Sequence, residues 1–291
     1  LITFSRMFYF MQRWGLLRRF RRSIDLGGDN GAWSAFFKGA GIVRHATSVD
    51  LVSTFSKIDA NHFQSFVNFL RNLKDDKHSR LISDLIIRSK QAFDYFPDQG
   101  IMNGVYCEFS NPLAVDEHLT MDFFDATGTF DLVLSCGSLD CYDLDETFAK
   151  IRQLLSKDGI YVGLEEYWWW PHNSSSFVGR FPYAIQRLSY SDLERYAAQY
   201  EPDLLPTLKE RYSYLYAGTR PTVNDWMAAA ARQGLKLIAI ERIIPKEHHR
   251  IYECPPTMFK AIDPSEVLRD IHYLKSDVGI EDLMTSVIQV A

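Results

Sequence analysis

The fold is decided by one stretch, Ser23-Ile24-Asp25-Leu26-Gly27-Gly28-Asp29-Asn30-Gly31-Ala32-Trp33. It reads as the end of a buried strand, a glycine-rich turn and the start of a helix. Glycine suits such a turn because it adopts backbone angles that other residues avoid, and because it lets a bulky ligand approach the main chain closely. The first amides of the following helix would direct their N–H donors, and a partial positive charge, at whatever binds on the turn.

An acidic residue follows this turn where a second strand should end. Asp50 closes the short stretch Thr47-Ser48-Val49-Asp50. We expect a second parallel strand to stop there, with its carboxylate placed to accept hydrogen bonds from ribose hydroxyls. A strand, a glycine turn, a helix and a strand ending in an acid together indicate a nucleotide-binding unit.

Composition narrows the class of protein. The chain has 291 residues, of which 46% are hydrophobic and 24% charged, and this is typical of a globular protein with a sizeable core. A net charge of -5 argues against nucleic acid as the default partner, because phosphate binding favours a basic surface. The cysteines show no metal-ligand spacing, which predicts reduced thiols in a cytoplasmic protein. No apolar run has the length that spans a bilayer.

Residues 1–22 predict an amphipathic helix with a basic flank, because large apolar side chains recur at helical spacing among arginines. One interpretation is contact with a membrane surface or with an anionic protein partner. The alternative is a helix packed against the main sheet, with arginine stems covering its rim.

Strands and helices alternate along the rest of the chain. We expect strands over 117–124, 130–136, 160–166 and 235–242, a partner strand over 251–261, and helices over 145–155 and 221–234. This alternation predicts an α/β fold with a doubly wound, mostly parallel sheet.

Three further segments stand apart from that sheet. Apolar stripes at helical spacing predict a helical insert over about residues 56–105, and such inserts often cover a substrate. An aromatic-rich region over about residues 167–220 is interpreted as a lid. Residues 262–291 are expected to form a C-terminal helical tail.

Taken in order, these residues resemble the class I S-adenosylmethionine-dependent methyltransferases. Asp25-Leu26-Gly27-Gly28-Asp29-Asn30-Gly31 resembles the first motif of the family, and Ser48-Val49-Asp50 resembles the acid that ends its second strand. Met121-Asp122-Phe123-Phe124 resembles the acid of the third strand, and Phe130-Asp131-Leu132-Val133-Leu134-Ser135 the fourth strand. Leu154-Leu155-Ser156-Lys157-Asp158-Gly159-Ile160 resembles the turn into the fifth. The resemblance implies a seven-stranded Rossmann-like sheet and a methyltransferase domain over 23–261.

Two departures from the family pattern accompany this resemblance. Asp29 replaces the middle glycine of the first motif, and the helical insert lengthens the chain between the second and third strands. The first departure bears on cofactor binding, and the second indicates that the substrate-binding part is particular to this protein.

The resemblance also implies a set of cofactor contacts. Main-chain atoms around the glycines would hold the methionine and ribose parts, Asp25 would reach the methionine amino group, and Asp50 would bind the ribose hydroxyls. Asp122 would accept from the adenine amino group, Phe123 would pack on the adenine ring, and the carbonyl of Ser135 would meet the amino acid end. The full set is Asp25, Gly27, Gly28, Asp29, Gly31, Asp50, Leu51, Asp122, Phe123 and Ser135.

Several of these cofactor assignments have an alternative. The glycines could form a plain tight turn. Asp50 could cap a helix, and Asp125 could take the role assigned to Asp122.

Candidates for the methyl acceptor side are Tyr167, His172 and Asp140, which follow strands at the carboxyl edge, where open α/β sheets bind ligands. His172 titrates in the range of a general base, but a surface histidine after a proline is the alternative. The tryptophans of 168–170 either line an apolar acceptor pocket or anchor the lid. His248-His249 has no third ligand at metal-binding spacing, so we interpret it as a loop.

The resemblance implies methyl transfer from S-adenosylmethionine to a small-molecule, glycan or other polar acceptor, at oxygen or nitrogen, by in-line displacement without a metal. A nicotinamide-dependent dehydrogenase would instead need glycine where this chain has Asp29 and Ala32. A third interpretation is a non-catalytic, methyltransferase-like binding or scaffold domain of a longer polypeptide. Asp29 and a first residue, Leu1, that is not methionine keep this interpretation open.

Overall fold

The computed structural model describes residues 7, 10–11, 13–28, 31–39, 42–51, 115–139, 142–167, 169, 183–206, 208, 220–243, 263–285 and 287–291. The chain divides into two compact units. The first comprises Leu1–Ser138, Lys150–Leu164 and Val290–Ala291, and the second comprises Leu139–Ala149 and Glu165–Gln289.

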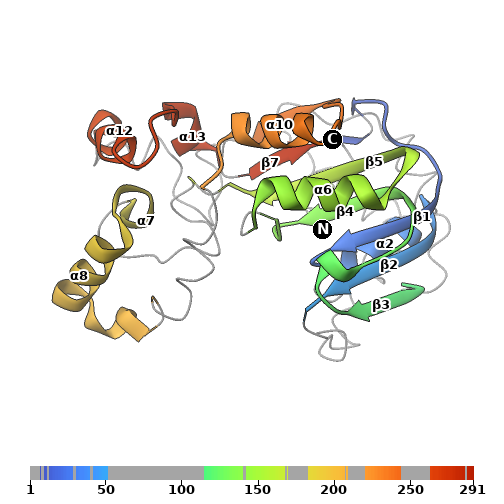
Figure 1. The fold of residues 1–291 in the computed structure, drawn as a ribbon, viewed down its shortest axis with the longest axis horizontal. Helices are drawn as coiled ribbons and strands as arrows, with labels where there is room; N and C mark the ends of the chain where they lie inside the picture. The colour runs from blue at the N-terminus through green and yellow to red at the C-terminus, as the bar shows by residue number, and fades with distance from the viewer. Residues whose placement is uncertain are drawn as a thin grey trace, which may run out of the picture. The chain divides into compact units, whose positions relative to one another are not determined.

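In the described residues, seven strands form one sheet in the order β3-β2-β1-β4-β5-β7-β6 (Figure 1). Their bounds are Phe20–Leu26 for β1, Val43–Asp50 for β2, Glu117–Thr120 for β3, Phe130–Cys136 for β4, Leu155–Glu166 for β5, Ile240–Ile243 for β6 and Val287–Val290 for β7. The pairs β1–β2, β1–β4, β2–β3 and β4–β5 are all parallel. The predicted seven-stranded, mostly parallel α/β sheet is confirmed.

The order of the strands reverses at β1. The chain goes outward from β1 to β2 and β3 on one side, and then returns to β4 and β5 on the other. Such a switch point separates the loops that follow two neighbouring strands, which opens a crevice at their carboxyl ends. The switch point therefore lies between β1 and β4.

The centre of the first unit is apolar on both faces of the sheet. Ile24 and Leu26 of β1 and Leu132 and Val133 of β4 are all fully buried. Strands covered on both faces read as continuous apolar runs, which is why 130–136 was predictable as a strand. Helix α2, Ala32–Gly39, packs on β2 and β1, and its Phe37 side chain is fully buried.

The remaining described helices are the 3-10 helices η3, Phe123–Asp125, and η4, Pro202–Leu204, and the α-helices α6, Leu144–Leu154, α7, Ala184–Arg187, α8, Tyr190–Tyr200, α10, Val223–Arg232, α12, Pro264–His272, and α13, Ile280–Met284. In the second unit, α10 begins with a capping box between Thr222 and Asp225, which satisfies amides that a helix start leaves open. The helix expected over 221–234 is therefore present as α10, which begins directly after its N-cap Thr222 and ends at Arg232.

The N-terminal segment differs from the helix expected over 1–22. Met7, Phe10 and Met11 are helical and buried, but the helix gives way to a turn at Gly15, whose φ is +67°, and β1 already begins at Phe20. Because Met7, Phe10 and Met11 are buried, whereas Trp14 is 42% exposed, the packed-helix interpretation is supported for these three side chains and their contact with a membrane surface is not. Among the described ranges, no helix combines the length and hydropathy that crossing a bilayer requires.

Other expected bounds also need correction. β3 ends at Thr120 and not at residue 124, because Asp122 caps η3 directly after it. β5 begins at Leu155, five residues before the expected start at 160, and β6 begins only at Ile240. The tail expected to be helical ends in strand β7, whose Ile288 and Val290 are buried.

Several expected segments fall outside the description. The insert over about 56–105 and the partner strand over 251–261 lie outside the described residues. Of the lid expected over about 167–220, the structure describes chiefly the helices α7 and α8.

Asp116 fastens β2 and α2 to the start of β3. Its carboxylate accepts hydrogen bonds from Lys38 Nζ at 2.6 Å and from the Ala46 amide at 2.8 Å. Burial acts to raise the pKa of Asp116, but the bonds from Lys38 and Ala46 and the charges of Lys38 and His45 outweigh it. The pKa of Asp116 therefore lies below its ordinary value of 3.8.

We expect Asp116→Asn to lower the free energy of unfolding near neutral pH. Because the pKa is lower in the folded than in the unfolded state, the carboxylate stabilises the fold above the unfolded-state pKa and loses this effect as pH falls through the folded-state pKa. Urea unfolding of parent and variant between about pH 7 and about pH 2 should show the difference shrinking toward acid. The exposed Asp158→Asn serves as control, and a difference that persists at the acid end would contradict the assignment.

Candidate functional site

The carboxyl ends of β2, β1 and β4 lie side by side in the first unit (Figure 1). Leu26, the last residue of β1, is in register with Val49 of β2 and with Ser135 of β4. Residues that follow these three strands are therefore brought together at one edge of the sheet. The predicted glycine turn leaves β1 at this edge.

The turn after β1 has the geometry that its glycines predict. Gly27 and Gly31 have φ of +66° and +73°, in the left-handed region that favours glycine. The Gly28 amide donates to the Val49 carbonyl at 3.0 Å, and the Gly31 amide donates to the Gly28 carbonyl at 2.7 Å. The turn is thus bonded to the end of β2 and leads directly into α2.

The turn has no room for side chains at its first two positions. A Cβ on Gly27 would lie 2.4 Å from Ser138 Cβ, and a Cβ on Gly28 would lie 2.2 Å from Ser48 Oγ. On its other side, Ser138 Oγ donates to the Leu26 carbonyl at 2.7 Å. Main chain alone therefore passes between β2 and the segment after β4, as it does where backbone must approach a ligand closely.

The two acids of the predicted motif have different settings. Asp25 is 1% exposed, and its Oδ2 lies 3.2 Å from the position of a Cβ on Gly28, so its carboxylate is buried next to the turn. Asp50 is half-buried at the end of β2, and Leu51 after it is 56% exposed. An ionised carboxylate can only accept hydrogen bonds, which suits Asp50 to hydroxyl donors at this edge.

The residues after β3 are held in a short helix. Asp122 Oδ1 accepts from the Phe124 amide at 3.0 Å and so caps η3. Phe123 is 4% exposed and contacts Phe124, with ring centroids 4.2 Å apart. The ring expected to face a ligand is therefore largely covered, and the half-buried Phe124 presents more surface.

Ser135 forms a buried polar pair with the neighbouring strand. Its Oγ and the hydroxyl of Tyr161 are 2.8 Å apart. Gly163 gives this tyrosine its space, because a Cβ there would lie 2.2 Å from the Tyr161 hydroxyl. The side chain of Ser135 is thus used within the sheet, which is compatible with the expected role of its main-chain carbonyl.

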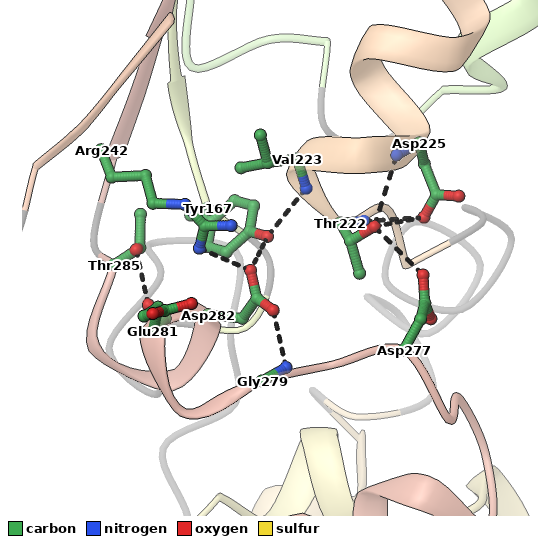
Figure 2. A network of polar contacts seen from close by, with 10 residues as sticks. All are labelled: Tyr167, Thr222, Val223, Asp225, Arg242, Asp277, Gly279, Glu281, Asp282 and Thr285. Atoms are coloured by element: carbon green, nitrogen blue, oxygen red, sulfur yellow. Dashed lines mark hydrogen bonds and ion pairs between the residues drawn. The ribbon is translucent and has the colours of Figure 1, made fainter.

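The hydroxyl of Tyr167, a predicted acceptor-side residue, is engaged in hydrogen bonds within the second unit. Within the second unit its hydroxyl donates to Asp282 Oδ1 at 2.5 Å and accepts from the Val223 amide at 3.0 Å (Figure 2). Arg242 and the Gly279 amide also bind the Asp282 carboxylate, at 2.7 and 2.8 Å. Burial and the nearby charge of Asp282 raise the pKa of Tyr167 far above its ordinary value. A tyrosine so engaged ties the end of β5 to α10 and α13, and the structure does not support its use as a catalyst.

The other acceptor-side candidates are not described. Asp140 and His172, like Asp29 of the turn and His248-His249, lie outside the described residues. In the described part of the chain, no three His, Cys, Asp or Glu side chains gather as a metal site would require.

Sequence reasoning missed three polar side chains that lie near or after the ends of strands. Ser48 lies under Gly28, and Ser138 lies against Gly27. In the second unit Glu165 is fully buried, and its Oε2 accepts from the Leu139 amide at 3.1 Å. Polar residues at the carboxyl ends of apolar strands were the available signal in all three cases, but it did not say what they contact.

Solved structures resemble this chain while sharing little of its sequence. The cyclopropane synthase MmaA2 from Mycobacterium tuberculosis matches 98% of this chain and 82% of its own, at 12% identity and a TM-score of 0.44. Geranyl diphosphate C-methyltransferase from Streptomyces coelicolor A3(2) matches 98% of this chain and 77% of its own, at 10% identity and a TM-score of 0.45. The YcgJ protein from Bacillus subtilis matches 98% of this chain and 97% of its own, at 10% identity and a TM-score of 0.44. Neither a family model nor a curated protein matches the sequence. Because these identities and TM-scores are low, we assign the fold from the chain's own strand order and register.

We expect Gly27→Ala to lower the free energy of unfolding more than Gly15→Ala does. Both glycines have nearly the same left-handed φ, +66° and +67°, so both variants carry the conformational cost of about 1–2 kcal/mol. Only Gly27 has a side chain, that of Ser138, in the space of the new methyl group, whereas nothing lies within 4 Å of that position at Gly15. Urea unfolding measures both losses.

A second substitution isolates the steric part of this effect. Ser138→Gly removes the two atoms nearest to the new methyl group, so it should restore part of the stability that Gly27→Ala loses. Ser138→Gly alone supplies the reference for this comparison. Equal losses for Gly15→Ala and Gly27→Ala, without any restoration, would show that the turn is not crowded.

We expect Tyr167→Phe to lower the free energy of unfolding by about 1–3 kcal/mol, because the Val223 amide and Asp282 each lose a buried partner. Tyr183→Phe is the matched control, since Tyr183 is as well buried but donates a longer bond of 3.3 Å to the Leu283 carbonyl. Thermal unfolding of the two variants compares them. A loss for Tyr183→Phe as large as that for Tyr167→Phe would remove the special role of Tyr167.

Proposed function

We propose that the chain binds S-adenosylmethionine at the turn after β1 and transfers its methyl group to a small-molecule, glycan or other polar acceptor, at oxygen or nitrogen. One observation carries this proposal. The main chain of Gly27 and Gly28 is packed between Ser48 and Ser138 at the switch point of a parallel sheet, and Asp50 closes the next strand. Open α/β sheets bind nucleotide ligands at such a place.

The residues at this edge fit an adenosyl ligand. A ribose offers two hydroxyl donors, and the half-buried carboxylate of Asp50 can accept both. The methionine part carries an ammonium group and a carboxylate, which match the buried Asp25 and the amides that begin α2, respectively. When bound, the cofactor would supply a methyl group on a positively charged sulfur. That sulfur would leave as a neutral thioether, so the transfer needs no metal.

The chain's own residues would hold the ligand from three sides. Backbone of the turn, including Gly31 and Asp29, would border the methionine and ribose parts, and Leu51 would add apolar surface next to Asp50. We propose Asp122 and Phe123 for the adenine side, where η3 follows β3. The carbonyl of Ser135, in register with Leu26, would border the amino acid end.

The acceptor side of the proposal rests on the sequence. Asp140 and His172 are proposed as candidates for a general base where the acceptor must lose a proton. Tyr167 is left out, because its hydroxyl is bonded to Asp282 and Val223. Most of the rate of an in-line displacement can come from holding acceptor and methyl group at reacting distance, so the site needs few chemical groups of its own.

Calorimetric titration with S-adenosylmethionine and with S-adenosylhomocysteine tests the proposal. We expect saturable binding of both, and an affinity at least about tenfold lower for Asp50→Ala, because hydrogen bonds to a charged group contribute about 1.5–3 kcal/mol each. Asp158→Ala is the control. Asp158 is exposed in the same unit, and its carbonyl, which accepts a hydrogen bond from Arg18, is kept in this variant.

The outcomes separate the three functional classes. If the parent chain binds neither ligand, the methyltransferase proposal fails and the scaffold interpretation gains. If it binds reduced nicotinamide dinucleotide more tightly than either ligand, the dehydrogenase interpretation takes its place. If Asp50→Ala binds as tightly as the parent, the ligand sits elsewhere than at the end of β2.

A further inference from the structure

We infer that Ser138 is a positioning residue for the ligand of the glycine turn: it fixes Leu26 and Gly27 in the conformation that receives the ligand. The inference rests on the proposed function, because it names a further residue of the same site. Ser138 follows β4 and is not part of the motif that the turn itself carries.

One side chain contacts both residues where β1 passes into the turn. Ser138 Oγ donates to the Leu26 carbonyl at 2.7 Å, across a separation of 112 positions in the sequence. The Cβ and Oγ of the same serine are the atoms nearest to the missing side chain of Gly27, at 2.4 and 2.8 Å from where a Cβ would be. Ser138 therefore restrains Leu26 by a hydrogen bond and Gly27 by contact.

Ser138 is itself held in place by the neighbouring strand. Gly137 has a φ of +65°, and its amide donates to the Leu164 carbonyl of β5 at 2.9 Å. This bond fixes the backbone immediately before Ser138 as it turns away from the end of β4. The restraint on Gly27 is thus anchored to β5, the strand on the other side of β4 from β1.

The turn has particular need of such a restraint. Glycine loses more conformational freedom on ordering than any other residue, and Gly27 and Gly28 adjoin each other here. A ligand that had to order this turn on binding would lose affinity in proportion to the freedom removed. A restraint already present in the ligand-free protein avoids that loss, so Ser138 should raise affinity without touching the ligand.

The position differs from that of the structural serines nearby. Ser34, Ser48 and Ser135 are fully buried, whereas Ser138 is half-buried and lies at the open edge of the sheet. A hydroxyl that served packing alone would be expected among the buried set. The place of Ser138 at the carboxyl edge, next to the turn, favours a role in holding that turn in its ligand-binding conformation.

The test compares Ser138→Ala with Ser156→Ala in the full chain. Ser156 is also half-buried in the first unit, and its hydroxyl donates to Asp131 Oδ1 at 3.3 Å, away from the turn. Calorimetry with S-adenosylhomocysteine gives the affinity, and hydrogen exchange of the ligand-free proteins reports on the Gly28 amide. We expect Ser138→Ala to bind about three- to tenfold more weakly, as the loss of one hydrogen bond predicts, and Ser156→Ala to bind like the parent.

Hydrogen exchange distinguishes positioning from general stability. A positioning role predicts faster exchange at the Gly28 amide, with unchanged exchange at buried amides of β4 such as that of Val133. Faster exchange throughout β1 and β4 would assign Ser138 a merely structural role and overturn the inference. It would equally be overturned if the parent bound the ligand and Ser138→Ala bound it as tightly, and the proposed function would then stand. If the parent failed to bind the ligand, both the positioning role of Ser138 and the proposed function would be overturned.

Discussion

The structure depends on the lack of space around the backbone where β1 ends. Two consecutive glycines pass between Ser48, which comes from β2, and Ser138, which follows β4, and neither position can hold even a methyl group without displacing a neighbour. A turn on the protein surface does not require such crowding. The crowding brings three strand ends into contact, and it leaves peptide groups as the lining of the edge at which parallel sheets bind their ligands.

The buried sheet makes this arrangement rigid. The central residues of β1 and β4 are covered on both faces, so the strand ends cannot shift independently of one another. The hydrogen bonds of Gly28 to β2 and of Ser138 to the end of β1 then fix the turn against that support. A site built from the ends of packed strands is held more accurately than one built from loops alone.

The sequence predicted what local pattern controls. The apolar run of β4, the glycine turn and the acid that ends β2 each carry their signal within a few residues, and their positions are confirmed. Prediction from the sequence failed where contacts between distant residues determine the local structure. Phe20 reads as part of an amphipathic helix until its pairing with Val43 makes it a strand, and β7 gains its place only by joining the sheet. The bond of Tyr167 to Asp282 is not predictable from the sequence around Tyr167, which favours an acceptor-side role for this residue. Ser138 was missed for the same reason.

We propose that an adenosyl ligand lies against the turn after β1, with its ribose at the end of β2. A crystal structure of the chain with S-adenosylhomocysteine tests this most directly. We expect both ribose hydroxyls within hydrogen-bonding distance of the Asp50 carboxylate, and the amino acid end of the ligand over Gly27 and Gly28. A ligand bound away from these residues, or no ligand at this edge under saturating conditions, would contradict it.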